Sequence, residues 1–244
     1  MTNTNLEMMS SASTLHNKVS VTTSARLHMG FFDLNGGLGR RFGSIGVALQ
    51  TPTISLTAFP EQTFSAEGVG ANRAVQIAEQ LAQDLKIKLG MHIKLDRVIP
   101  EHAGLGSGTQ LSLAVGMAMS RLYDLDLSVN QIAALTKRGM RSGVGLGTFA
   151  QGGLIVDGGR ATNSEVPPVI ARADFPEDWP ILLIFDQQHQ GVHGAEEVSA
   201  FNAYFLSTRD LGSPRETVPR IPWWPNAAPL PQTSFSFPIP AFRY

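Results

Sequence analysis

The chain has 244 residues, 43% of them hydrophobic and 16% charged, and a formal net charge of −1. This balance is typical of a globular protein with one large or two small domains, and it indicates no basic face for nucleic acid. The absence of cysteine excludes disulfides, thiolate zinc sites and cysteine nucleophiles. No apolar run approaches the ~20 residues of a membrane-spanning helix, and the polar N-terminus lacks a signal-peptide core. We therefore expect a cytoplasmic protein with no membrane partner.

Hydrophobic periodicity predicts strands and helices after a loose polar extension at residues 1–18. Apolar residues alternate with threonine and serine over 53–59, as in a half-buried strand, and Ser128 with Gln131 forms a capping box opening a helix that ends at Gly139. A continuous apolar run at 181–185 predicts a strand buried on both faces. The other expected elements are helices at 72–85, 109–122 and 195–205, and strands at 91–95 and 154–156. This mixture indicates an α+β fold with several antiparallel pairs.

Proline dominates the end of the chain. Eight of the fifteen prolines lie between Pro214 and Pro240, a density that sustains neither helices nor central strands. We interpret residues 208–244 as an irregular tail.

The segment Pro-Glu-His-Ala-Gly-Leu-Gly-Ser-Gly-Thr-Gln at 100–110 lies between a predicted strand and a predicted helix. Its glycines, Gly104, Gly106 and Gly108, let backbone N–H groups approach a ligand closely. The helix that follows adds unpaired N–H groups and the positive end of its dipole, which suit phosphate. The hydroxyls of Ser107 and Thr109 can add contacts to phosphate or help hold a divalent cation. The segment therefore predicts a phosphate-binding loop, against the alternative of a plain turn, and it is not a Walker loop because no Gly-Lys-Ser/Thr follows.

Four segments together carry a family resemblance. The loop at 100–110 resembles the Pro-x-x-x-Gly-Leu-Gly-Ser-Ser/Gly motif of the GHMP kinase superfamily. With the segments 25–47, 138–159 and 186–197, it is similar to the beta-ribofuranosylaminobenzene 5'-phosphate synthases, which share the GHMP fold. The resemblance runs from about residue 19 to about residue 203.

The resemblance implies a domain organisation. A GHMP-kinase-like N-terminal domain, with a mixed or antiparallel sheet and packed helices, is expected at 19–160. The start of a second α+β domain is expected at 161–207, and the tail leaves that domain incomplete.

The resemblance also implies a pentosyltransferase rather than a kinase. Such enzymes join 4-aminobenzoate, or a related hydroxybenzoate, to phosphoribosyl pyrophosphate and release pyrophosphate and carbon dioxide. The product leads to the methanopterin-type one-carbon carrier. Mg²⁺ is the expected cation, and a homodimer is expected from the family alone.

A substrate with a pyrophosphate and a 5'-phosphate needs two anion sites. Residues 104–109 can supply the first. The second glycine-rich segment can supply the other, because arginine forks suit phosphate and carboxylate oxygens. The candidates there are Arg138, Arg141, Ser142 and Gly143.

Loss of pyrophosphate leaves an oxocarbenium-like sugar that a nearby carboxylate can stabilise. Asp33 is the first candidate for this catalytic role, with Arg26 from the same segment beside it and Glu196 as the next carboxylate. Glu197 and Ser107 are candidate magnesium ligands.

Each assignment has a structural alternative. Arg26 and Arg40 can be surface residues or ion-pair partners, and Asp33 can cap the turn at 35–36. The glycines of 143–147 can serve close packing alone. His189 and His193 have the spacing of two zinc ligands, but the intervening Gly191 and the lack of a third ligand favour a loop or substrate contact.

Two rival functions stay open. A GHMP small-molecule kinase would hold ATP in the same loop, although 142–147 lacks the Pro-Ser-Gly-Ile/Met-Asp pattern of many such kinases. The tail favours a non-catalytic remnant, because synthases of this family are expected to run well beyond residue 244. That interpretation expects weak or absent turnover, an exposed apolar face and ready proteolysis after Arg209, Arg215 or Arg220.

Overall fold

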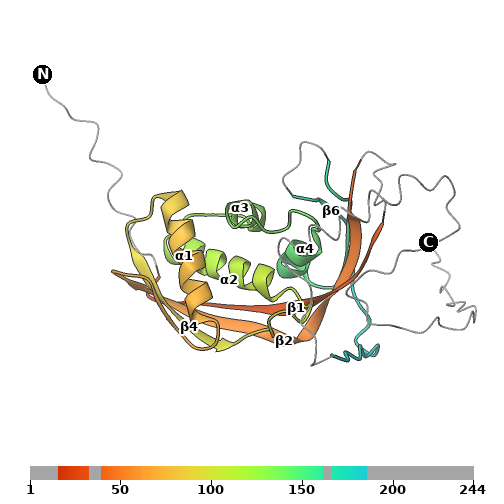
Figure 1. Ribbon diagram of the computed structural model, residues 1–244, viewed down its shortest axis with the longest axis horizontal. Coiled ribbons are helices and arrows are strands. Elements are labelled where there is room, and N and C mark those ends of the chain that lie inside the picture. The colour runs from red at the N-terminus through yellow and green to blue at the C-terminus, as the bar shows by residue number, and fades with distance from the viewer. Residues whose placement is uncertain (1–15, 33–39, 162–165, 186–244) are drawn as a thin grey trace, which may run out of the picture. The chain divides into compact units, whose positions relative to one another are not determined.

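The computed structural model describes residues 16–32, 40–161 and 166–185 (Figure 1). All of them lie in the unit Met1–Gly191. The expected helix at 195–205 and the tail at 208–244 lie outside the described residues, as does most of the expected N-terminal extension. Among the described helices, none has the length and apolar character needed to cross a bilayer.

A sheet of six strands forms the base of the fold. The long hairpin of β1 (Val19–Phe32) and β2 (Gly43–Glu61) is antiparallel. The other edge of β2 pairs with β5 (Leu154–Asp157) near its start and with β4 (Gly90–Arg97) toward its end. The outer strands are β3 (Ser65–Glu67), parallel to β4, and β6 (Val169–Ala173), antiparallel to β5. The sheet therefore continues past residue 160, where the sequence suggested a domain boundary.

Helices cover one face of this sheet (Figure 1). They are α1 (Ala71–Leu85), α2 (Ser107–Leu122), α3 (Val129–Leu135) and α4 (Val144–Gln151). Most of α2 is buried, because its small and apolar residues pack on the sheet and against the other three helices. The N-terminal ends of α2 and α4 meet, since a Cβ on Gly145 would lie 3.2 Å from Thr109 Cγ2.

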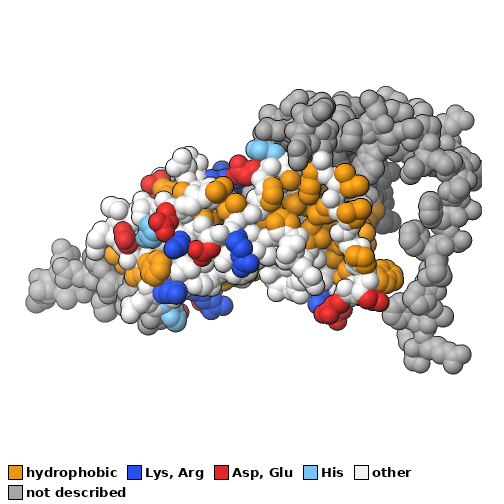
Figure 2. Space-filling view, turned by 90° about the horizontal axis from the view of Figure 1, so that it is seen from below, with side chains coloured by type: hydrophobic (Ala, Val, Ile, Leu, Met, Phe, Trp, Pro, Cys, Tyr) orange, Lys and Arg blue, Asp and Glu red, His pale blue; other side chains and the backbone are white. Residues whose placement is uncertain are grey.

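The opposite face of the sheet has a hydrophobic half and a charged half. Figure 2 shows hydrophobic side chains gathered on one half of this face and charged side chains on the other. The register places Leu27, Val47 and Leu154 in one row across β1, β2 and β5. Ile155, the neighbour of Leu154, points the other way and packs under Gly147 of α4. The row of Leu27, Val47 and Leu154 therefore belongs to the face away from α4.

Most of the expected elements are confirmed, and the α+β class with them. The capping box at Ser128 is present, with Gln131 N 3.3 Å from Ser128 Oγ, although α3 ends at Leu135 rather than at Gly139. The strand predicted at 181–185 is wrong. Leu182 and Ile184 are 83% and 86% exposed, and no described strand pairs with them. An apolar run forms a strand only where a neighbouring strand supplies hydrogen bonds.

Candidate anion-binding site

The glycine loop ends in an open helix N-terminus. Gly104 and Gly106 have φ values of 73° and 79°, which favour glycine, and α2 begins directly after Gly106. The first hydrogen bond into the helix runs from Gln110 N to Gly106 O at 3.0 Å. The N–H groups of residues 107–109 precede that bond, and no side-chain hydrogen bond caps the helix at Gly106. This terminus therefore presents free donors and a positive dipole end.

Arg26 lies against this loop. Its Nη1 donates to Gly104 O at 2.5 Å, and its backbone N–H donates to Leu105 O at 3.1 Å. A Cβ on Gly106 would lie 3.2 Å from Arg26 Cγ and Nε. The absence of a side chain at Gly106 thus lets strand β1 bring a guanidinium against the backbone of the loop.

Two further guanidinium groups reach the first turn of α2. A Cβ on Gly108 would lie 2.4 Å from Arg73 Nη2 and 3.7 Å from Arg138 Nη1. Arg138 Nε donates to Ser112 Oγ at 3.2 Å, and Ser112 Oγ donates to Gly108 O at 2.9 Å. Burial and the charge of Arg73 lower the pKa of Arg138. The structure thus gathers three positive side chains at a positive helix end.

The second glycine-rich segment is built differently. It forms the buried helix α4, and its N-terminus is closed by a carboxylate of the chain itself. Asp157 Oδ2 accepts a hydrogen bond from Gly143 N at 2.9 Å and one from the hydroxyl of Ser44, while Oδ1 accepts from Gly159 N at 2.9 Å. Ser142 Oγ lies 3.3 Å from Asp157 Oδ2 and accepts from Val144 N at 3.2 Å.

Gln110 joins the two helix starts. Its side chain is fully buried, accepts from Thr23 Oγ1 at 2.6 Å and donates to Gly145 O at 2.8 Å. A buried amide with both ends satisfied fixes the relative position of its neighbours. Gln110 therefore sets how α2 and α4 meet beneath the loop.

His28 lies on the helix-facing side of β1. Its ring centroid is 4.3 Å from that of Phe31, and its Nε2 is buried with no hydrogen-bond partner. Burial, helped by the charge of Arg26, lowers the pKa of His28 to about 4. The imidazole is therefore neutral at pH 7.

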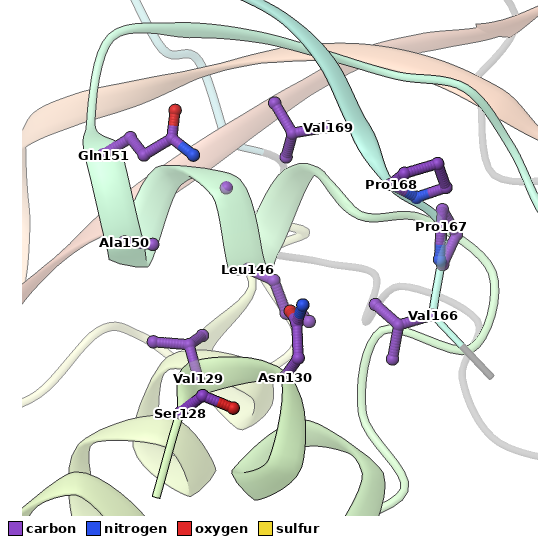
Figure 3. A pocket seen from close by; sticks show the side chains of 11 residues that line it. Ser128, Val129, Asn130, Leu146, Ala150, Gln151, Val166, Pro167, Pro168 and Val169 are labelled. Carbon is purple, nitrogen blue, oxygen red and sulfur yellow. The ribbon is translucent and has the colours of Figure 1, made fainter. Parts of the chain in front are cut away.

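A separate cavity of about 490 Å³ lies beside α4 (Figure 3). Val129 of α3, Leu146 of α4 and Val169 of β6 line it from three elements. The complete lining is Ser128, Val129, Asn130, Leu146, Gly147, Ala150, Gln151, Val166, Pro167, Pro168 and Val169. No charged side chain is among them, so the cavity does not suit phosphate.

The structure brings part of the predicted site together. Arg26, Gly104, Gly106, Gly108 and Arg138 meet at the start of α2, in company with Ser107 and Thr109. Arg141, Ser142 and Gly143 lie before or at the start of α4, and their role in binding an anion stays a prediction. Asp33, Glu196 and Glu197 lie outside the described residues, as do His189 and His193.

Sequence reasoning missed Arg73 and the structural role of Asp157. No motif marks Arg73, since it is the third residue of an ordinary amphipathic helix and reaches the loop only through the fold. The pair Asp157-Gly158 is typical of a turn, and it contains no sign of the distant partners Gly143 and Ser44.

The described residues contain no group of three histidine, aspartate or glutamate side chains that could hold a metal ion. Mg²⁺ is commonly bound through one or two protein ligands together with the phosphates of a substrate. Ser107 lies on the first turn of α2, and its role as a magnesium ligand stays a prediction.

The described residues form a sheet covered on one face by four helices, with a glycine loop that opens α2, as in a GHMP-kinase-like fold. Residues 72–152 match the family of GHMP kinases N terminal domains. The fold is also similar to that of L. major mevalonate kinase in complex with R-mevalonate. The TM-score is 0.52 at 15% identity, over 81% of this chain and 64% of that one. The predicted GHMP-kinase-like fold is thereby confirmed.

The particular resemblance is to synthases. The chain is 39% identical over 197 residues to the beta-ribofuranosylphenol 5'-phosphate synthase of Archaeoglobus fulgidus, covering 73% of this chain and 60% of that protein. It is 35% identical over 214 residues to the synthase of the same name from Methanocaldococcus jannaschii, with coverages of 75% and 64%. The predicted resemblance is confirmed, and the chain spans less than two thirds of the length of these relatives.

Proposed function

We propose that this chain carries the phosphate-binding part of a pentosyltransferase that makes a C-riboside 5'-phosphate from phosphoribosyl pyrophosphate and a benzoate. The observation that carries the proposal is the open start of α2, with its free N–H groups and the guanidinium groups of Arg26, Arg73 and Arg138. An array of this kind suits a pyrophosphate, which has more charge and more acceptor oxygens than a single phosphate.

The names of the relatives support a choice of acceptor. They are called synthases of a ribofuranosylphenol 5'-phosphate, so a hydroxybenzoate is the first acceptor to test here. The acceptor expected from the sequence, 4-aminobenzoate, is the second. In either case the ring carbon that bears the carboxylate bonds to C1' of the sugar. The C1'–O bond breaks with its electron pair on pyrophosphate, and the ring recovers its electrons as carbon dioxide leaves.

The glycine loop assists the breaking of the C1'–O bond. Negative charge accumulates on pyrophosphate as the C1'–O bond lengthens, and fixed donors at that position stabilise the transition state more than the ground state. Mg²⁺, held by Ser107 and the pyrophosphate oxygens, would supply additional positive charge to the leaving group. The second anion site is proposed at Arg138 and Arg141, because Asp157 already accepts the hydrogen bonds of Gly143 N and Ser142 Oγ at the start of α4.

A single-turnover assay tests the reaction, because it detects slow chemistry. The full chain, in excess, is mixed with Mg²⁺, phosphoribosyl pyrophosphate and a carboxyl-labelled benzoate, and labelled carbon dioxide is collected. We expect release that needs phosphoribosyl pyrophosphate and is not supported by ATP.

Parallel mixtures with ATP and small alcohols test the kinase alternative. Transfer of phosphate to an alcohol without carbon dioxide release would favour the kinase. Binding of phosphoribosyl pyrophosphate without any product would favour the non-catalytic remnant.

A further inference from the structure

Arg73 and Glu101 form an ion pair at the edge of the glycine loop. Arg73 lies in the first turn of α1, Glu101 lies in the loop between β4 and α2, and Arg73 Nη1 is 2.9 Å from Glu101 Oε1. The two side chains are 33% and 53% exposed. An ion pair this accessible to water contributes little to stability, so bracing the loop is a weak reason for its geometry.

The other end of the same guanidinium points to a different role. Arg73 Nη2 occupies the space where a side chain on Gly108 would begin, 2.4 Å from the position of its Cβ. It therefore lies over the turn whose N–H groups face an incoming anion. Arg138 Nη1 would lie 3.7 Å from the same Cβ, and the positive charges of Arg73 and Arg138 repel each other.

Among the described residues, this arrangement places two positive side chains beside one paired carboxylate. Arg73 and Arg138 meet at the positive end of the α2 dipole, and Glu101 is the carboxylate that the structure pairs with Arg73. A pyrophosphate carries several charged oxygens and can accept both prongs of a guanidinium, whereas Glu101 accepts one. Exchange of Glu101 for pyrophosphate would therefore relieve the repulsion between the arginines.

We propose that Arg73 binds the pyrophosphate of the substrate, and that Glu101 holds its guanidinium over Gly108 until pyrophosphate takes the place of the carboxylate. The inference rests on the proposed function only for the identity of the anion. It adds to the site a pyrophosphate-binding residue from α1 and a competing carboxylate from the loop itself.

Calorimetric titration of the full chain with inorganic pyrophosphate tests the inference. Arg73→Ala should weaken binding about tenfold or more, because a charge-assisted contact is lost. Glu101→Gln should tighten binding about two- to fivefold, because the competitor loses its charge. In the Arg73→Ala background, Glu101→Gln should have little effect, since the two changes are coupled through one contact.

Asp174→Asn is the matched control, because it breaks the ion pair of Arg172 and Asp174 at the end of β6, which is 2.5 Å long. It should leave pyrophosphate affinity unchanged. Arg73→Lys keeps the charge but loses the fork, and it should fall between the wild type and Arg73→Ala.

Unchanged affinity in a folded Arg73→Ala variant would overturn the inference. Equal weakening by Arg73→Ala and Glu101→Gln would also overturn it, because the pair would then be a brace for the loop. If pyrophosphate binding follows the expected pattern but no riboside forms, the proposed function fails and this inference stands. If riboside forms and Arg73→Ala leaves the KM for phosphoribosyl pyrophosphate unchanged, the inference fails alone.

Discussion

The carboxylate of Asp157, at the end of β5, accepts a hydrogen bond of 2.9 Å from the backbone nitrogen of Gly143, at the start of α4. An internal anion thus occupies the N-terminus of α4, whereas no side-chain hydrogen bond from the described residues caps the N-terminus of α2. Two glycine-rich helix starts that look alike in sequence are therefore distinguished by one buried carboxylate.

Asp157→Asn should lower the free energy of unfolding by about 2–4 kcal/mol. The amide replaces an acceptor with a donor in a site where N–H and O–H groups already converge, and hydrogen bonds to a charged group are the stronger kind. Urea denaturation followed by circular dichroism measures the change. The exposed Asp96→Asn on β4 is the control and should change stability by less than about 0.5 kcal/mol. Equal stability of the two variants would show that Asp157 does not anchor α4.

Gln110→Leu should cost about 2–3 kcal/mol, because the Thr23 hydroxyl loses its acceptor and the Gly145 carbonyl loses a donor in the core. Adding Thr23→Val should recover part of this loss, since it removes the stranded hydroxyl with little change of shape. A double-mutant cycle by chemical denaturation gives the coupling energy. Strictly additive effects would mean that Gln110 does not link α2 to its neighbours through this bond.

Alanine substitution of two glycines on α2 should have different effects, one on binding and the other on stability. Gly108→Ala should weaken pyrophosphate binding about tenfold with little loss of stability, because the new Cβ displaces only the flexible tip of Arg73. Gly116→Ala should destabilise the fold by about 1–3 kcal/mol, because its Cβ would lie 2.3 Å from Ile132 Cγ2 in the packed contact with α3. Denaturation and calorimetry on both variants separate the effects. Loss of binding by Gly116→Ala at temperatures where it stays folded would contradict this division.

His28 should make the free energy of unfolding depend on pH. Its pKa is lowered from 6.5 to about 4 in the folded chain, so the unfolded chain binds more protons between those values. Stability should therefore rise with pH from about 4 to about 6.5, by up to about 3 kcal/mol from this residue. His28→Gln should flatten the curve of unfolding free energy against pH over that window. An NMR titration of the His28 ring with a midpoint near 6.5 would contradict the prediction.

The sequence predicted the framework because local patterns decide it. The capping box of Ser128 and Gln131 and the apolar spacing of the helix at 72–85 each involve residues a few positions apart. The glycine loop was predicted for the same reason, since its chemistry lies in consecutive residues. The prediction of a strand at 181–185 was wrong because an apolar run does not reveal whether a neighbouring strand is present to pair with it.

The parts of the site that could not be predicted depend on long-range contacts. The packing of α1 against α2 brings Arg73 to Gly108. The pairing of β5 with β2, beside α4, brings Asp157 to Gly143. The helix over 144–151 was not predicted, because helix propensity disfavours glycine. In the structure, Gly147 is needed there because Ile155 and Val169 lie within 3 Å of where its Cβ would be.

The affinity of the full chain for phosphoribosyl pyrophosphate, compared with that for ATP, tests the central claim most directly. Isothermal titration with Mg²⁺ should show binding of phosphoribosyl pyrophosphate in preference to ATP, and Gly106→Val should abolish it. Valine at φ 79° is strained, and its side chain would displace Arg26 from the loop. Near-ultraviolet circular dichroism confirms that the variant is folded. Unchanged affinity in the folded variant, or preferential binding of ATP by the wild type, would contradict the account.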